Sequence, residues 1–173
     1  MKKILSVLLA ICVLATFAFF AVGSSDDSSA SVSQGEGAEN SDSSSEAQTL
    51  TVNVGDTLTT DFLKITYSEC VEYKDYNEFS APESGNTVYR LKVDIENISD
   101  SDQFVSTWDY TCYADDNAAD EYYYGDNSLS ATISAGRKTS GYIYFEVPKD
   151  AENIEVEYET DFWSSKKAIF VVK

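Results

Sequence analysis

Histidine is absent from the 173 residues of this chain, and positively charged residues are scarce. The missing imidazole removes the usual general base of serine and cysteine hydrolases and the commonest zinc ligand. There are 12 Lys and Arg residues against 30 Asp and Glu residues, which gives a formal net charge of −18 at pH 7. Such a charge repels the phosphates of nucleic acids and anionic lipids. We therefore expect no nucleic-acid partner.

The one long apolar run lies at the start of the chain. Two lysines precede Ile4–Val22, a run of 19 nearly unbroken apolar residues, and this order is typical of an export signal. A cut between Gly23 and Ser24 would release the rest of the chain. The run is longer than the roughly 7–15 residues of a typical signal core and nearly meets the ~20 residues that span a bilayer as a helix. We interpret residues 1–23 as a signal peptide or signal anchor, and favour the anchor.

Residues 24–48 form a segment without aromatic or basic residues. Ten of its 25 residues are serine and six are acidic. A segment of this composition buries too little apolar surface to offset the entropy of ordering. The sequence therefore predicts a disordered linker that lifts a folded domain off the membrane.

From residue 49 to residue 173 the composition changes to that of a folded domain, which holds all 12 tyrosines and both tryptophans. The clearest strand is Val88–Asn97, in which apolar and charged side chains alternate. No segment of the body shows an extended helical period. The sequence predicts an all-β fold, an antiparallel β-sandwich of about seven strands. The expected strands are 50–54, 62–73, 88–97, 104–114, 142–147, 154–159 and 168–172.

Three stretches of the body resemble a known family. They are GNTVYRLKVDIENIS (85–99), WDYTCYADDN (108–117) and SAGRKTSGYIYFEVPKDA (134–151), and they are similar to the family called domain of unknown function 4352. The resemblance implies a bacterial exported protein, often a lipoprotein, with an immunoglobulin-like fold. It implies no catalytic residue. Val22 stands where such lipoproteins carry the acylated cysteine, so attachment would rely on the apolar segment.

Two of the three cysteines, Cys70 and Cys112, fall in the predicted body, on separate strands. In an oxidising exported setting they can pair, which would close a loop of about 42 residues and stabilise the fold by up to ~4 kcal/mol in the chain-entropy model. The alternative is two buried thiols, because Cys112 follows Trp108 and Tyr110 at a spacing of two along the strand. The sequence leaves both interpretations open.

The loop 114–127 concentrates carboxylates. Calcium takes six to eight oxygen ligands, which clustered acidic residues on a loop can partly supply. The spacing does not match the EF-hand pattern, so a solvated acidic loop is the preferred interpretation and no cofactor is expected. The candidate ligands of the calcium alternative are Asp115, Asp116, Asp120, Glu121 and Asp126.

Three consecutive tyrosines, Tyr122, Tyr123 and Tyr124, follow this acidic stretch. Exposed aromatic rings at the end of a sandwich stack on sugars or anchor a protein partner. The alternative, which we favour, is packing in the core or across strands.

Taken together, these features predict a non-enzymatic binding module that is exported and tethered to the cell surface, with secretion after cleavage before Ser24 as the alternative. The expected partner is a protein or an envelope component, and contact with the membrane runs through the N-terminal apolar segment. Competing hypotheses are a structural accessory domain of the envelope, a calcium-binding surface domain, and more remotely a carboxylate-based hydrolase.

Overall fold

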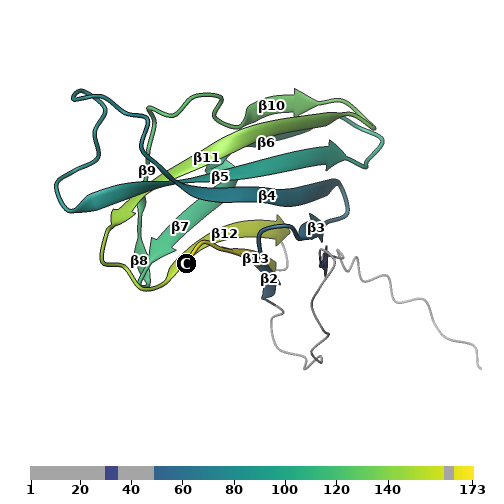
Figure 1. Cartoon of the computed structure of the whole chain (residues 1–173). Helices are drawn as coiled ribbons and strands as arrows, with labels where there is room; N and C mark the ends of the chain where they lie inside the picture. The colour runs from purple at the N-terminus through teal and green to yellow at the C-terminus, as the bar shows by residue number, and fades with distance from the viewer. Residues whose placement is uncertain (1–29, 35–48, 162–165) are drawn as a thin grey trace, which may run out of the picture.

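The computed structural model describes residues 30–34, 49–161 and 166–173, whose strands form a β-sandwich (Figure 1). One sheet has six strands, in the spatial order β1 (Ser31–Ser33), β3 (Thr57–Thr59), β4 (Leu63–Tyr73), β5 (Asn86–Asn97), β11 (Lys138–Pro148) and β9 (Asp120–Glu121). The other has five, in the order β2 (Leu50–Val52), β13 (Lys166–Val171), β12 (Ile154–Asp161), β7 (Tyr110–Ala114) and β8 (Asn117–Ala118). A short pair joins β6 (Gln103–Ser106) to β10 (Ser130–Ile133).

The long central strands form where the sequence alternates. β5 pairs antiparallel with β4 on one side and with β11 on the other. Its Leu91, Val93 and Ile95 are almost fully buried, while the charged residues between them are partly exposed. β11 ends at Pro148, which has no N–H to continue the ladder. The all-β prediction and the long strand over Val88–Asn97 are confirmed.

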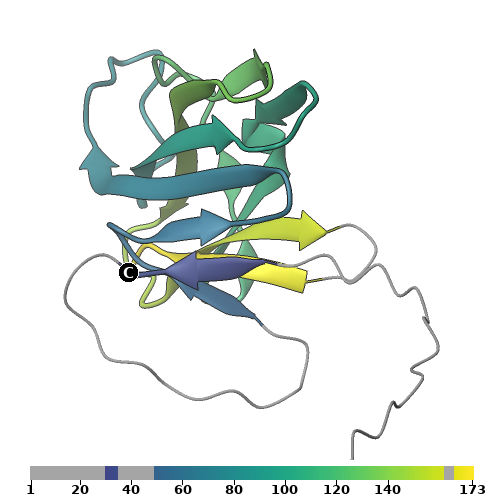
Figure 2. The ribbon, with the colours of Figure 1, turned by 90° about the vertical axis from the view of Figure 1, so that its right-hand side faces the viewer.

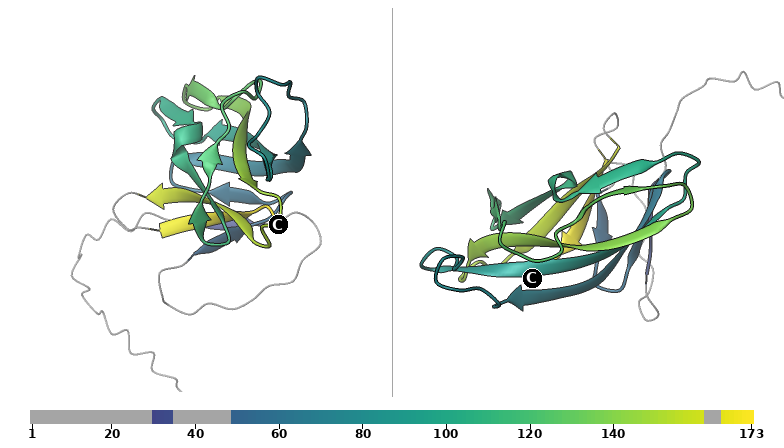
Figure 3. Two further views of the ribbon diagram at one scale, coloured as in Figure 1. Left: turned by 90° about the vertical axis from the view of Figure 1, so that its left-hand side faces the viewer. Right: turned by 90° about the horizontal axis from the view of Figure 1, so that it is seen from above.

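The core lies between the two large sheets, which are stacked in the end views (Figure 2 and the left view of Figure 3). Each sheet contributes its inward-facing side chains, because alternate residues of a strand point to opposite faces. The six-stranded sheet supplies Tyr67, Leu91 and Ile143, and the five-stranded sheet supplies Ile154 and Phe170, all with relative exposure of 1% or less. Tyr67 and Phe170 meet edge to face across the interface, with ring centroids 5.4 Å apart.

Two predictions about the chain's organisation need correction. The prediction that residues 24–48 form a disordered linker is wrong for Ser31–Ser33, which pair with Thr57–Thr59 as the edge strand β1. The single strand predicted over 104–114 is interrupted by a 3₁₀ turn, η1 (Thr107–Asp109). Ser106 precedes this turn and its N–H bonds to Asp109, which breaks the extended backbone.

The predicted signal or anchor over 1–23, with its cleavage position at Gly23 and Ser24, lies outside the described residues. Within the described ranges, no helix is long and apolar enough to cross a membrane.

One end of the sandwich is organised by Asn97, whose side chain is fully buried. Its Nδ2 donates to the carbonyl oxygens of Ser101 and Ile133, both at 2.7 Å, and its Oδ1 accepts from the backbone N–H and the hydroxyl of Ser99. These bonds tie the end of β5 to the segment that follows it and to the last residue of β10. A buried amide with this many partners is a structural residue, which leaves the Asn97-Ile-Ser99 sequence no accessible glycosylation site.

Candidate functional site

Three aromatic side chains are exposed in one groove at the end of the sandwich near Asn97. Phe62 is 55% exposed, Phe104 is 64% exposed and Trp108 is 83% exposed. All three line a groove of about 520 Å³, which we call the aromatic groove. It is built by the turn between β3 and β4, by β6, η1 and β7, and by the adjoining ends of β12 and β13. In Figure 1 this end lies to the right, and Figure 2 faces it.

Thr60 shapes the turn that presents Phe62. The Thr60 hydroxyl accepts hydrogen bonds from the N–H groups of Phe62, at 3.3 Å, and of Leu63, at 3.0 Å. The backbone of Thr60 also donates to the carbonyl of Leu63, which closes the turn. The carbonyl of Phe62 accepts from the N–H of Ile98, so the turn is fixed against the end of β5 while the Phe62 ring faces solvent.

Trp108 is held outward by the 3₁₀ turn η1. The N–H of Ser106 donates to Oδ2 of Asp109 at 2.7 Å, and this bond closes the turn that contains Thr107 and Trp108. Burial raises the pKa of Asp109, and the Ser106 N–H opposes that rise by favouring the charged carboxylate. The turn buries Thr107 and leaves the indole of Trp108 in solvent. The expectation that Trp108 shares a buried face with Tyr110 and Cys112 is therefore wrong.

The floor of the groove carries charge. Lys167 donates to Glu157 at 2.5 Å, and this bond raises the pKa of Lys167. Glu159 lies beside them on β12, and Thr111 and Tyr113 on β7 add polar atoms. Aromatic rings beside carboxylates can stack on a flat or cationic group and accept its hydrogen bonds.

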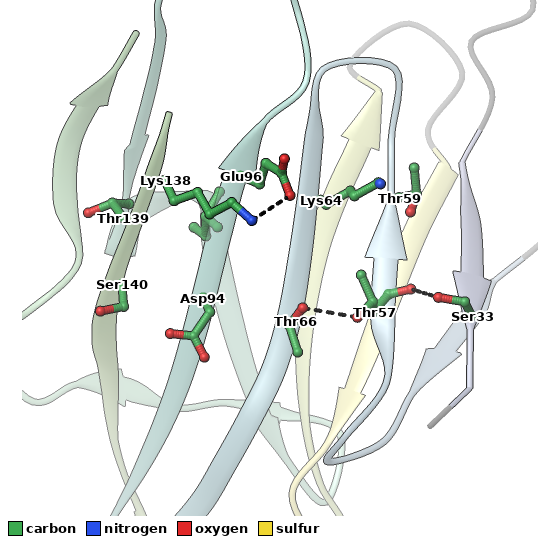
Figure 4. A pocket seen from close by; sticks show the side chains of 11 residues that line it. Ser33, Thr57, Thr59, Lys64, Thr66, Asp94, Glu96, Lys138, Thr139 and Ser140 are labelled. Carbon is green, nitrogen blue, oxygen red and sulfur yellow. Dashed lines mark hydrogen bonds and ion pairs between the residues drawn. The ribbon is translucent and has the colours of Figure 1, made fainter. Parts of the chain in front are cut away.

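A second hollow, of about 640 Å³, lies on the outer face of the six-stranded sheet (Figure 4). Several of its polar groups are paired with one another. Lys138 bonds to Glu96 at 3.1 Å, and the hydroxyls of Thr57 and Thr66 are 2.9 Å apart. A ligand there would have to replace these interactions, and none of the described lining residues is aromatic. The aromatic groove is the stronger candidate.

The five predicted calcium ligands do not gather in one place. Asp115 and Asp116 form the two-residue turn between β7 and β8, Asp120 and Glu121 lie on β9 at the sheet edge, and the carbonyl of Asp126 accepts from Tyr144 at 2.8 Å. Among the residues that the structure describes, no group of three acidic or cysteine side chains is close enough to hold a metal ion.

Asp115 has a structural role instead. Its carboxylate accepts hydrogen bonds from the N–H groups of Glu152 and Asn153, at 3.0 and 2.8 Å, and its own N–H donates to the carbonyl of Asn153. Asp115 and Asp116 have φ angles of 46° and 65°, the left-handed backbone of a tight hairpin turn. The acidic pair therefore closes a hairpin and connects it to the start of β12.

The three consecutive tyrosines divide between burial and exposure. Tyr122 is buried, and its hydroxyl donates to the carbonyl of Ser80 at 2.7 Å, whereas Tyr123 and Tyr124 are 73% and 66% exposed. Tyr122 packs with Tyr73 and Tyr144 in a small cluster separate from the main core. Packing is thus the role of the first tyrosine, and the other two are surface rings at the end of the sandwich opposite the aromatic groove.

Cys70 and Cys112 are both free thiols in the structure. Cys112 is buried, and this burial raises its pKa to about 12. Burial also raises the pKa of Cys70, which packs at the edge of the same core.

Sequence patterns did not point to the aromatic groove. Phe62 and Phe104 were placed in predicted strands, where an aromatic residue is ordinary. The signal that was available is the spacing Ser106-Thr-Trp-Asp109, in which Ser and an acidic residue three positions later are typical of the start of a helical turn. Such a turn projects the Trp108 ring away from the strand.

A family model matches residues 52–169, which include every residue that lines the aromatic groove. The chain belongs to the family described as domain of unknown function (DUF4352). No curated protein matches the chain significantly.

Several solved structures share the fold of this DUF4352 chain. The yjhA protein from Bacillus subtilis has a TM-score of 0.54 and 13% identity, with 70% of this chain and 99% of that chain covered. An uncharacterized beta-sandwich protein from Clostridium difficile has a TM-score of 0.50 and 13% identity, covering 77% and 100%. A Bacillus subtilis protein described provisionally as a lipoprotein, ycdA, has a TM-score of 0.51 and 19% identity, covering 64% of this chain and 36% of that longer chain. At these identities the likeness concerns the fold.

Proposed function

We propose that this DUF4352 chain is a non-enzymatic binding module of the cell surface, which captures an envelope component or protein in the aromatic groove. In this proposal the immunoglobulin-like sandwich is a rigid scaffold, and the segments at its end carry the ligand site, as loops on such scaffolds commonly do. The observation that carries the proposal is the exposure of Phe62, Phe104 and Trp108 within one groove. Exposed apolar rings clustered in this way are typical of an interaction site.

An extracytoplasmic, membrane-anchored location is part of the proposal. Its support is the apolar run Ile4–Val22 behind two lysines, together with the shared fold of a Bacillus protein described provisionally as a lipoprotein. The length of the run favours an uncleaved anchor over release before Ser24.

The absence of catalysis is proposed from how the groove's polar groups are used. Asp109 accepts the N–H of Ser106, and Glu157 is bound to Lys167. A carboxylate-based hydrolase needs an acid and a second carboxylate that are available to the substrate. With no histidine in the chain, the usual alternative base is missing as well.

The test is sedimentation of purified full-length protein, in non-ionic detergent, with the detergent-insoluble fraction of cell envelopes isolated from the producing bacterium, so that the apolar run cannot cause sedimentation by inserting into lipid. We expect the wild type to co-sediment and the variant Trp108→Ala to lose about tenfold in affinity, since exposed tryptophans at interfaces are typical hot spots. Trp108 is 83% exposed, so its truncation should leave the fold intact.

Phe79→Ala is the matched control. Phe79 is 84% exposed and follows β4, at the end of the sandwich away from the groove. Its removal should leave sedimentation unchanged. Equal binding by wild type and Trp108→Ala, or equal loss in both variants, would show that the groove is not the ligand site.

A further inference from the structure

The aromatic groove is acidic as well as aromatic. Asp109, Glu157 and Glu159 line it, and among its described lining residues the one cation is Lys167. Lys167 is already bound by Glu157. The chain as a whole carries a net charge of −18. The electrostatic field at the groove therefore favours a positively charged ligand over a neutral or a negative one.

The same molecule shows how it holds a cation elsewhere on its surface. The guanidinium of Arg90 lies 4.5 Å from the centre of the Tyr142 ring and bonds to Glu69 at 2.7 Å. An aromatic face on one side and a carboxylate on the other satisfy both the π-face and the hydrogen-bond donors of the guanidinium. The groove presents these two groups together, in the indole of Trp108 and the neighbouring carboxylates.

The chain's own linker is a poor occupant of the groove. Residues 24–48 contain six acidic residues and no Lys or Arg, so the groove repels them. Anionic envelope polymers are excluded for the same reason. A neutral glycan could stack on Trp108, but it would leave the groove's carboxylates without a charged partner.

We infer that the aromatic groove binds a Lys- or Arg-bearing polypeptide segment of a surface or envelope protein, with a cationic side chain between Trp108 and the carboxylate of Glu159. This inference rests on the proposed function of the groove. A groove of about 520 Å³ lies within the ordinary range of ligand sites, and Gln103, Thr111 and Thr160 line it with polar atoms that can bond to the backbone of a bound segment.

The test uses the full-length protein in non-ionic detergent and a short fluorescent peptide that alternates Arg and Gly, measured by fluorescence anisotropy. The matched probe carries citrulline in place of Arg, which keeps the shape and removes the charge. We expect the Arg peptide to bind about tenfold more tightly than the citrulline peptide, and its affinity to fall as salt is raised.

Variants of the protein separate the contribution of the Trp108 ring from that of the Glu159 charge. Trp108→Ala should weaken the Arg peptide about tenfold, Glu159→Gln should weaken it about threefold, and Phe79→Ala should leave it unchanged. Glu159→Gln should leave the citrulline peptide unaffected, because that probe has no charge to lose.

Equal affinity for the two peptides, or no binding of either, would overturn the cationic ligand. If soluble peptidoglycan fragments then bind in a way that Trp108→Ala abolishes, the groove remains the binding site and its ligand is a neutral glycan. If envelope sedimentation is also insensitive to Trp108→Ala, the proposed function fails together with the inference.

Discussion

The hydroxyl of Tyr67, on β4, donates a hydrogen bond to the backbone carbonyl of Val171, on β13, across 3.1 Å. This bond joins the six-stranded sheet to the five-stranded sheet through the core. Tyr67 is fully buried, so its hydroxyl would otherwise lose its hydration without replacement. This hydrogen bond gives a buried hydroxyl a partner within a largely apolar interface.

Tyr67→Phe should therefore lower the free energy of unfolding by about 1 kcal/mol, the usual net worth of a buried hydrogen bond. Tyr110→Phe is the matched substitution, because the hydroxyl of Tyr110 is buried and has no partner among the described residues. Removing that hydroxyl should be neutral or stabilising by up to about 1 kcal/mol. Urea denaturation measures the change in unfolding free energy for each variant. Equal changes would contradict the assignment of a hydrogen-bond partner to the Tyr67 hydroxyl and none to the Tyr110 hydroxyl.

Asn97→Ala should destabilise the domain by about 2–4 kcal/mol, because four hydrogen bonds are lost and the buried carbonyl of Ile133 loses the amide that donates to it. Ser99→Ala removes a single hydroxyl from the same turn and should cost about 1 kcal/mol. The unfolding midpoint in urea gives both values. A change below about 0.5 kcal/mol for Asn97→Ala would show that the turn is not a structural anchor.

Asp116→Gly should stabilise the hairpin between β7 and β8 by about 0.5–1 kcal/mol. Asp116 has a φ of 65°, a backbone region that glycine occupies without steric cost, and an Asp-Gly pair is favoured in two-residue hairpins. Asp120→Gly is the control, since Asp120 lies on β9 and should lose stability instead. Thermal unfolding compares the two variants, and destabilisation by Asp116→Gly would contradict the left-handed backbone of Asp116 in the turn.

The alternating strands were predictable because each of them is long and has one buried face. β4, β5, β11 and β12 have 8 to 12 residues, enough for a period of two to emerge from the sequence. β1, β3 and β10 have 3 or 4 residues and carry no such period. Their pairing is decided by which edges the sandwich leaves open, and a local sequence window does not contain that information.

The candidate site was less predictable than the fold, for a related reason. The exposure of Phe104 and Trp108 depends on the 3₁₀ turn η1, which interrupts the predicted strand. A hydrogen bond between Ser106 and Asp109 stabilises this turn. The acidic loop was a candidate calcium site on its composition alone. Its Asp115 and Asp116 have positive φ angles, which tertiary structure sets and composition does not reveal.

Lowering the pH should stabilise the wild type relative to Asp109→Asn. Burial raises the pKa of Asp109, so the folded state holds its proton more tightly than the unfolded state, and folding gains as the pH falls through the folded-state pKa. Asparagine keeps an acceptor for the Ser106 N–H and does not titrate. The difference in unfolding free energy, wild type minus variant, should rise between neutral pH and about pH 4. A difference that falls over this range would contradict the raised pKa of Asp109.

Thiol reactivity should distinguish folded from unfolded protein. With a pKa of about 12, Cys112 carries almost no thiolate at neutral pH, and thiolate is the reactive form. We expect Cys112 to resist alkylation in the native state and both Cys70 and Cys112 to react fully in urea without reductant. Mass spectrometry of the alkylated peptides reads each site. Protection of both thiols in urea until reductant is added would instead reveal a disulfide.

The edge strand β1 gives the chain a mechanical property when the apolar run serves as the anchor. Between Val22 and β1 lie residues 23–30, which span at most about 29 Å when fully extended. β1 is a three-residue pair at the sheet edge, so tension on the tether should peel it from β3 long before the core yields. With β1 detached, the 26 residues from 23 to 48 span at most about 94 Å when fully extended. The domain would then have two working distances from the membrane, and pulling force would select between them.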